Sequence, residues 1–327
     1  MTDESLKFID ANASKPFFLH LAHYGVHTPL KAPAETTAKY ASWDGVPHGK
    51  QENPIYAAML EHVDRSVGRI VEKLEQLQLL GRTLIIFTSD NGGLATIEGP
   101  NTPATSNAPL REGKGWLYEG GIRVPLIVHA PEFHQSPPSR RKSSNRLQRG
   151  IAVRSPVWSC DILPTILQFT GVSEPQNLDG HSLMSELRGE EPQSSRELYW
   201  HYPHYSNQGG KPGGAVRIGN WKLIEHYESG RHELFDLSAG PNESRNLAAE
   251  NPRQAEILAE SLKLWRQRTG ARMPTPNPDY VPNLQAADGS ITLPAHGRRS
   301  WRATALRAFA AQKYARLLDE SRRLRDA

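Results

Sequence analysis

Two oxygen-bearing side chains directly follow a segment with the composition of a buried strand. The apolar run at residues 83–89 ends before Asp90 and Asn91, and a pair of glycines comes next. In an open α/β sheet, ligands bind beyond the carboxyl ends of the strands, so both side chains can face such a crevice. Carboxylate and amide oxygens suit hard cations such as Ca²⁺ or Mg²⁺, and a shell of roughly six oxygens needs further acidic groups. The pair indicates part of a divalent-cation site, with an ordinary turn as the alternative.

Two nitrogen-bearing side chains could act on an anionic ester. Lys114 lies between two glycines, which let the backbone approach a ligand closely, and its ammonium could hold one oxygen of a sulfate or phosphate ester. His27 precedes Thr28-Pro29, beyond a strand predicted over residues 15–22. An imidazole ionises near working pH, so His27 could protonate a leaving oxygen. Taken singly, the lysine could equally be an ordinary surface residue.

The elements that must position these residues alternate between helix and strand. Apolar residues at three- and four-residue steps predict a helix from Pro54 to about residue 80, stopped by Gly81. The further predicted elements are a strand at residues 83–89, a strand at residues 126–130 and a helix at residues 161–171. This order favours a parallel sheet with crossover helices.

The pattern changes after residue 195. Four short alternating segments, separated by turns that contain Gly and Asn, predict a small antiparallel sheet. A helix from Pro252 to about Arg268 would pack on that sheet, and a Pro-rich linker and a basic helix at about residues 301–325 follow. The predicted division is an α/β core at 1–195, an antiparallel-sheet subdomain at 196–270, and the linker with the terminal helix at 271–327.

Composition narrows the class of protein. The chain has 327 residues, a net charge of +4 and one cysteine, so no intrachain disulfide can form. No apolar run approaches the roughly 20 residues that span a bilayer, and the modest charge predicts no nucleic-acid partner. The acidic start lacks the features of a signal peptide. As written the chain is expected in the cytoplasm, or in the periplasm or medium if an upstream signal peptide has been lost.

The order and spacing of His27, the Asp-Asn pair and Lys114 resemble the formylglycine-dependent sulfatase family, of the type I, arylsulfatase-like kind. Further likeness lies at residues 119–125, 161–165, 178–183, 217–224 and 233–237, and the resemblance covers about residues 15–268. It implies an alkaline-phosphatase-like α/β fold. In that fold a mostly parallel sheet is flanked by helices, and a small C-terminal antiparallel sheet with a helix follows.

The resemblance also implies a mechanism. A formylglycine hydrate, derived from cysteine, attacks sulfur, the ester oxygen leaves with a proton, and the sulfated hydrate releases sulfate. A divalent cation, usually Ca²⁺ with Mg²⁺ as the alternative, neutralises the sulfate oxygens. By position, Asp90 and Asn91 would bind the metal. Lys114 would hold the sulfate and the leaving oxygen, while His27 would bind the sulfate and serve as general acid.

The chain departs from the family at the nucleophile. Cys160, the single cysteine, is followed by Asp161-Ile162-Leu163 and does not match the family motif Cys/Ser-x-Pro-x-Arg. We therefore expect the C-terminal portion of a sulfatase without its N-terminal nucleophile region, inactive alone, with an empty strand position in the sheet. The missing N-terminal half could be a separate chain.

The substrate is expected to be a sulfated carbohydrate or an aryl sulfate. His201 and His204 lie in an aromatic loop that suits a sugar or aryl ring, with simple loop packing as the alternative. Two other functions stay open. One is a phosphoesterase of the alkaline-phosphatase superfamily. The other is a non-catalytic fragment that binds sulfated glycans through the basic loop around Arg140.

Overall fold

The computed structural model describes residues 1–41, 52–131, 152–188, 190 and 196–278. By its internal contacts the chain forms two compact units, Met1–Pro274 and Thr275–Ala327. The second unit lies almost wholly outside the described residues, and so do the predicted terminal helix and the basic loop around Arg140. Among the described helices none is long and apolar enough to cross a membrane. The predicted boundary at residue 195 falls inside the first unit and stays a prediction.

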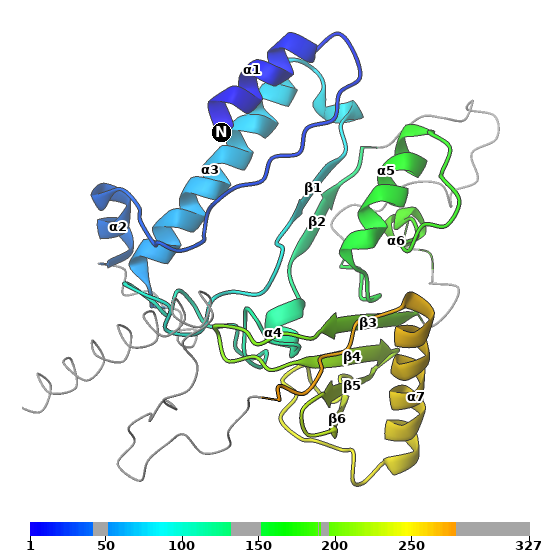
Figure 1. The fold of residues 1–327 in the computed structure, drawn as a ribbon. Coiled ribbons are helices and arrows are strands. Elements are labelled where there is room, and N and C mark those ends of the chain that lie inside the picture. Colours follow the sequence, from blue (N-terminus) through cyan, green and yellow to red (C-terminus); the bar gives the residue numbers. More distant parts are fainter. Residues whose placement is uncertain (42–51, 132–151, 189, 191–195, 279–327) are drawn as a thin grey trace, which may run out of the picture. The chain divides into compact units, whose positions relative to one another are not determined.

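A pair of helices forms one side of the first unit (Figure 1). Helix α1 (Thr2–Asn12), which the sequence analysis did not predict, packs along α3 (Pro54–Gln76), with Ile9 and Leu74 in a shared buried cluster. The Asn53 side chain caps α3 by accepting hydrogen bonds from the first turn. The helix ends earlier than predicted, because Gln78 takes the left-handed conformation, at φ 57°. Gly81 lies in the following 3-10 turn, η1 (Leu80–Arg82).

The segment before α3 differs from its prediction in two places. Residues 16–24 form no strand, and Phe17 and Leu19 pack instead against the cluster around Ile9. A strand needs a hydrogen-bonded neighbour to satisfy its backbone, and no described strand pairs with this segment. Helix α2 (Ala34–Ala41), which the sequence analysis did not predict, lies against α3.

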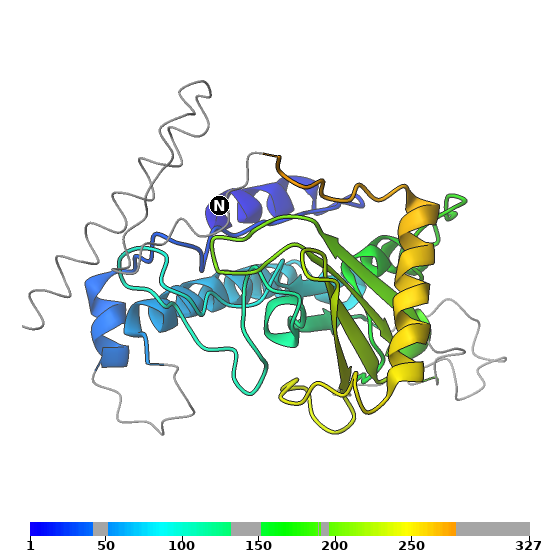
Figure 2. The same ribbon diagram turned by 60° about the horizontal axis from the view of Figure 1, so that its bottom comes forward.

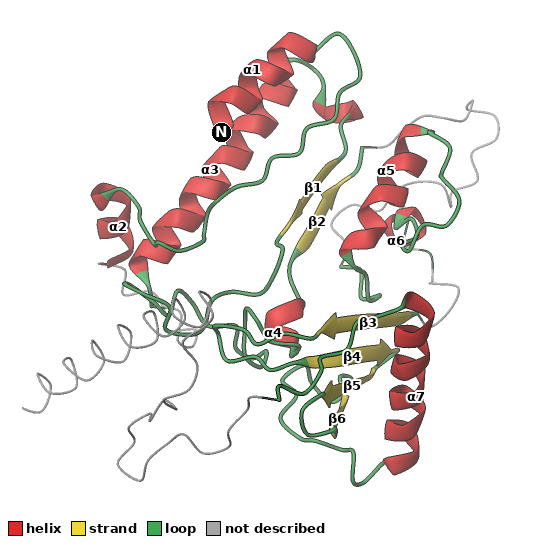
Figure 3. Ribbon diagram, in the orientation of Figure 1, coloured by secondary structure: helices red, strands yellow, loops and turns green. Residues whose placement is uncertain are grey.

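The predicted strands on either side of the site are confirmed, but their pairing is antiparallel. Strand β1 (Ile85–Thr88) pairs with β2 (Leu126–His129), with Ile85 opposite His129. Parallel pairing of these strands, which the sequence analysis favoured, is therefore wrong. The reason is the connection: in place of a crossover helix it contains only the single turn α4 (Glu119–Ile122) and long loops (Figure 3). Without a crossover the chain returns from the end of β1 in the opposite direction.

A groove of about 690 Å³ runs between α3 and the two-stranded ribbon. Its lining is mostly apolar and includes Leu60, Val63, Val67, Phe87 and Ile127. Ile127 is 62% exposed and Leu60 is 46% exposed, although both side chains belong to apolar patterns. Within the described residues, β1 and β2 each keep one unpaired edge. The expected empty strand position in the sheet stays a prediction.

Helices α5 (Ile162–Thr170) and α6 (Met184–Leu187) follow β2. The predicted helix at 161–171 is confirmed, and Gly171 ends it in the left-handed conformation, at φ 71°. The buried carboxylate of Asp161 binds the guanidinium of Arg196, with both nitrogens engaged, at 2.5 and 2.6 Å. This ion pair joins the start of α5 to the residue before the second sheet.

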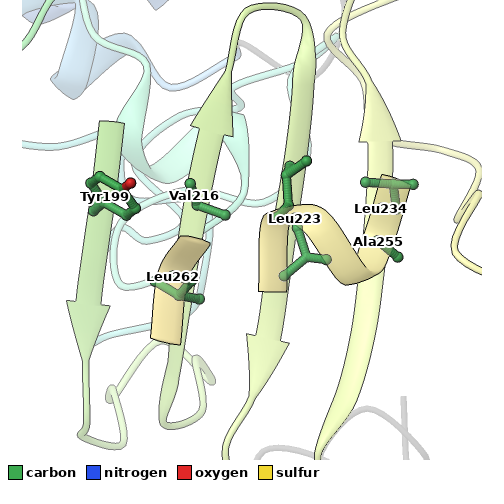
Figure 4. Close-up of a cluster of buried hydrophobic side chains, with 7 residues drawn as sticks. Tyr199, Val216, Leu223, Leu234, Ala255 and Leu262 are labelled. Atoms are coloured by element: carbon green, nitrogen blue, oxygen red, sulfur yellow. The ribbon is translucent and has the colours of Figure 1, made fainter. Parts of the chain in front are cut away.

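The predicted C-terminal sheet and helix are confirmed. The sheet has the order β3-β4-β5-β6 and is antiparallel throughout. Its strands are Glu197–Tyr202, Gly213–Ile218, Trp221–His226 and Arg231–Asp236. Helix α7 (Pro252–Thr269) covers one face, as Figure 2 shows. The core between them contains Tyr199, Val216, Leu223, Leu234, Ala255, Leu258 and Leu262 (Figure 4).

The other face of this sheet packs on the segment that follows Lys114. Ala215, Ile224 and Phe235 alternate in sequence with the residues under α7, so they face the opposite side. They form a second buried cluster with Tyr118, and Trp116 and Leu117 pack against it. The C-terminal sheet therefore supports the loop that carries the predicted sulfate-binding lysine.

Candidate active site

The structure brings together His27 and Lys114, which are 87 residues apart in sequence. The Nζ atom of Lys114 lies 2.6 Å from Nε2 of His27. The Nδ1 atom of His27 lies 2.8 Å from the carbonyl oxygen of Thr28 and so must donate a proton to it. Nε2 is then the acceptor, and the proton between the two side chains is held by Lys114. The pair carries one positive charge and can neutralise an anion and release a proton.

The backbone around Lys114 is held by contacts between glycines. The Lys114 amide donates to the carbonyl of Gly93 at 3.1 Å, and the Gly92 amide donates to the carbonyl of Gly121 at 2.9 Å. A Cβ at Gly113 would lie 2.4 Å from the oxygen of Gly93, so only glycine permits this approach. The loop after β1, the loop at residues 113–116 that carries Lys114 (the lysine loop) and α4 therefore pack closely through their backbones.

Asp90 and Asn91, the two predicted metal ligands, lie in the loop after β1. Asp90 is exposed, and the amide nitrogen of Asn91 donates to the carbonyl of Gly92 at 2.9 Å, which leaves Oδ1 of Asn91 free to accept. A carboxylate beside an amide oxygen fits a hard divalent cation. The described residues contain no group of three or more His, Cys, Asp or Glu side chains that could hold a metal. The two residues fit part of a cation shell, and the assignment stays a prediction.

A loop of the C-terminal subdomain forms a wall beside Lys114. The side chain of Ser206 lies so close to Gly115 that a Cβ there would meet it at 2.0 Å. The Trp116 indole donates to the carbonyl of Gln208 at 3.0 Å, and the Gln208 amide donates to Glu98 at 2.8 Å. Sequence reasoning missed this wall. The glycines at 209 and 210 were the available signal, because they allow the close approach of the two loops.

The two predicted substrate-binding histidines have different surroundings. Both ring nitrogens of His201 are engaged, Nδ1 at 2.6 Å from the Tyr227 hydroxyl and Nε2 at 2.9 Å from the carbonyl of Arg272. His204 is exposed and packs edge-on against Tyr202. Among the described residues no hydrogen bond joins either histidine to the His27–Lys114 pair. His204 lies two residues before Ser206, so it is closer in sequence than His201 to the wall beside Lys114. Its role in substrate binding stays a prediction.

Beneath the site lies a buried hydrogen-bonded network on β5 and β6. Glu233 accepts hydrogen bonds from the Tyr118 hydroxyl at 2.5 Å and from His226 at 2.9 Å. Burial acts to raise the pKa of Glu233, but the hydrogen bonds from His226 and Tyr118 outweigh it and lower the pKa to about 2. Burial and the same carboxylate raise the pKa of Tyr118. The network therefore holds a carboxylate in its ionised form next to the segment that carries Lys114.

The described residues place no nucleophile at the site. Partial burial and the carboxylates of Asp179 and Asp161 raise the pKa of the Cys160 thiol, which disfavours the reactive thiolate. The sequence contains one match to the serine form of the motif, because residues 136–140 read Ser-Pro-Pro-Ser-Arg. This segment lies outside the described residues. It also follows Asp90 and Lys114 in the chain, whereas the resemblance places the nucleophile before them.

Comparison with known families finds two matches that together cover most of the chain. The family model described as sulfatase matches residues 1–172. A second model, described as the C-terminal part of N-sulphoglucosamine sulphohydrolase, matches residues 113–269. The segment at 113–172 is common to both matches and contains Lys114 and α4.

Individual relatives and solved structures agree with these matches. A sulfatase of Formosa agariphila is 32% identical over 286 residues, which are 80% of this chain and 48% of the relative. Human steryl-sulfatase is 33% identical over 208 residues, 62% of this chain and 31% of the relative. The crystal structure of Ps i-CgsB in complex with k-i-k-neocarrahexaose superposes with a TM-score of 0.62 at 29% identity, covering 81% of this chain and 53% of that one. The chain thus spans half or less of the length of these two curated relatives.

Proposed function

Since this chain belongs to the sulfatase family, we propose that it supplies the sulfate-holding and proton-donating side of a site that hydrolyses a sulfate ester. The fold is the alkaline-phosphatase-like fold of that family. The observation that carries the proposal is the contact of 2.6 Å between Lys114 and His27, which collects a positive charge and a mobile proton at one place.

The two side chains would divide the work on the ester. The Lys114 ammonium would pair with a sulfate oxygen, and charge-assisted hydrogen bonds of this kind are stronger than neutral ones. His27 would take a proton from the Lys114 ammonium onto Nε2, because its Nδ1 is fixed by the carbonyl of Thr28, and would pass it from Nε2 to the ester oxygen. The ester oxygen would thus leave as a neutral hydroxyl rather than as an alkoxide. The nucleophile would come from polypeptide outside this sequence.

A divalent cation, Ca²⁺ or Mg²⁺, would complete the charge balance. Asp90 and Asn91 would contribute a carboxylate and an amide oxygen to it. When bound, the cation would polarise the sulfate oxygens. The remaining ligands would come from outside the described residues.

The substrate class we favour is a sulfated carbohydrate. The description of the C-terminal family model names an amino-sugar sulfohydrolase, and the crystal structure of Ps i-CgsB contains an oligosaccharide. The loop with Ser206 and Gln208 and the exposed His204 offer hydroxyl, amide and imidazole groups, which can bind the hydroxyls of a sugar. An aryl sulfate remains the alternative substrate.

The apolar groove supports the proposal that further polypeptide completes the fold. Its lining of α3 and ribbon side chains and the unpaired strand edges suit an added strand. We propose that the N-terminal half of a sulfatase, on the same or on a separate polypeptide, occupies this position and brings the nucleophile.

The test is a titration of the full chain with inorganic sulfate, followed by NMR of the His27 imidazole and the Lys114 side chain. We expect saturable shifts in the unaltered protein and in Lys263→Met, which removes an equal charge from the exposed face of α7. We expect the binding to be lost in Lys114→Met. Equal sulfate binding in Lys114→Met and Lys263→Met would refute the proposed site.

A further inference from the structure

Three buried charged side chains form a closed ring behind the site. The ammonium of Lys222 donates to Glu119 at 2.9 Å and to Glu243 at 2.8 Å. The second oxygen of Glu243 accepts the backbone amide of Glu119 at 2.6 Å, which closes the ring. The three residues come from different segments: Glu119 begins α4, Lys222 lies in β5, and Glu243 lies in the connection from β6 to α7.

The ring is out of contact with solvent. The Lys222 and Glu243 side chains are fully buried, and that of Glu119 is 3% exposed. The ring carries two negative charges and one positive charge. The second oxygen of Glu119 has no hydrogen bond, and the nearest cations are Arg123 at 3.8 Å and Arg217 at 3.9 Å. A buried ion pair of this kind seldom adds much stability over apolar residues of similar volume.

The ring is connected to the site through α4. Behind Glu119, the Gly120 amide donates to the carbonyl of Arg111 at 2.9 Å, and the carbonyl of Gly121 accepts the Gly92 amide at 2.9 Å. A Cβ at Gly121 would lie 2.1 Å from the carbonyl oxygen of Trp116, so the backbones of α4 and the lysine loop are in close contact. A displacement of α4 must therefore move the Asp90–Gly93 loop and the lysine loop together.

We propose that Lys222, Glu119 and Glu243 are positioning residues, which hold α4 so that Lys114 stays against His27 and the Asp90–Gly93 loop stays against the backbone of Lys114. This inference rests on the proposed function for the meaning of the site, but the mechanical link itself does not depend on it. The C-terminal sheet thereby acts on the site through a buried charge ring, besides presenting the Ser206–Gly210 wall.

The titration behaviour of neighbouring groups agrees with this arrangement. Burial raises the pKa of Glu243 against the opposing effect of Lys222, and burial lowers the pKa of Arg217. Burial is the leading cause of both shifts.

The experiment compares Glu243→Gln and Glu119→Gln with the control Glu225→Gln in the full chain. Each ring variant keeps the side-chain shape and leaves one lysine with one carboxylate, so the ring becomes neutral and the fold is retained. A Lys222 variant is avoided, because two buried carboxylates without a cation would unfold the chain. Glu225 lies on the same strand as Lys222 but pairs with Arg266 of α7, away from α4.

Two measurements separate positioning from stability. The first is hydrogen exchange at the amides of Gly92, Gly120 and Lys114, with β4 and β5 amides as the internal reference. We expect exchange at these three amides to be about tenfold faster in both ring variants, with the reference amides unchanged. The second is the shift of the His27 imidazole resonances and the affinity for inorganic sulfate, which we expect to fall about threefold or more.

The outcomes are distinguishable. Unchanged exchange at the three amides, or equal acceleration in Glu225→Gln, would overturn the positioning role. Sulfate binding that is equally strong in the unaltered chain and in both ring variants would also overturn it and would leave the proposed function standing. Faster exchange in the ring variants of a chain that binds no sulfate would uphold the positioning role and refute the proposed function.

Discussion

Lys114 donates to Nε2 of His27 across 2.6 Å, although the two residues reach this place on unrelated loops. The histidine is fixed from behind by the carbonyl of Thr28, and the lysine is fixed through its own amide by Gly93. Both residues are therefore held through backbone groups, and the proton shared by the two side chains lies between Nζ of Lys114 and Nε2 of His27.

The chain alone should give no turnover of p-nitrophenyl sulfate, with or without added Ca²⁺. Covalent catalysis needs a positioned nucleophile, and the described residues supply none. Release of p-nitrophenol is the measurement, with a complete sulfatase as the positive control. Saturable release that disappears in His27→Ala would contradict the prediction. If the release is also lost in a separate Ser136→Ala variant, Ser136 of the Ser-Pro-Pro-Ser-Arg segment would be identified as the nucleophile.

Acid should destabilise the C-terminal sheet through Glu233. The pKa of this carboxyl is lowered from 4.5 to about 2, so the folded state holds it ionised. The resulting stability is present above the unfolded pKa of 4.5 and is lost as the pH falls through about 2, an amount of up to about 3 kcal/mol. Urea unfolding between pH 6 and pH 2 measures it. Glu233→Gln should flatten this dependence, whereas Glu256→Gln on the exposed face of α7 should leave it unchanged.

Leu262→Ala should create a cavity under α7. The side chain is fully buried against the sheet (Figure 4), and such truncations cost about 2–5 kcal/mol. Leu264→Ala is the matched control, because Leu264 lies on the same helix and is 49% exposed, and its change should stay within about 0.5 kcal/mol. Equal losses in the two variants by urea unfolding would show that α7 does not pack as described.

Gly121→Ala should disrupt the site region. The new Cβ would lie 2.1 Å from the carbonyl oxygen of Trp116 and 2.6 Å from that of Gly113, so the backbone would have to move. We expect a loss of about 2 kcal/mol or more, measured by thermal or urea unfolding. Gly68→Ala in α3 is the control: its Cβ meets nothing within 4 Å, so helix propensity should stabilise that variant by about 0.5–1 kcal/mol. A tolerated Gly121→Ala would mean that α4 and the lysine loop are not in close contact.

Local patterns in the sequence determined most of the elements. Alternation of apolar residues and the Gly-Asn and Ser-Gly turns were sufficient for β3 to β6, because hairpins depend on neighbouring residues. The apolar period was likewise sufficient for the presence of α3 and α7, although α3 ends earlier than predicted. The candidate site residues were predicted because histidine, an Asp-Asn pair and a glycine-flanked lysine follow one another in the order of a known family.

The tertiary structure decided what those patterns could not express. In the sequence Lys222 lies between two apolar residues and looks like a solvent-exposed strand residue. In the structure its side chain is fully buried and pairs with Glu119, 103 residues away. Likewise β1 and β2 look like strands of a parallel sheet, yet they pair antiparallel because their connection contains no crossover helix. The spacing of apolar residues indicates which face of its own helix or strand a side chain occupies. Contacts between distant segments are set by packing and charge pairing across the fold, so the contact of Lys114 with His27 and the ring behind it appear only in three dimensions.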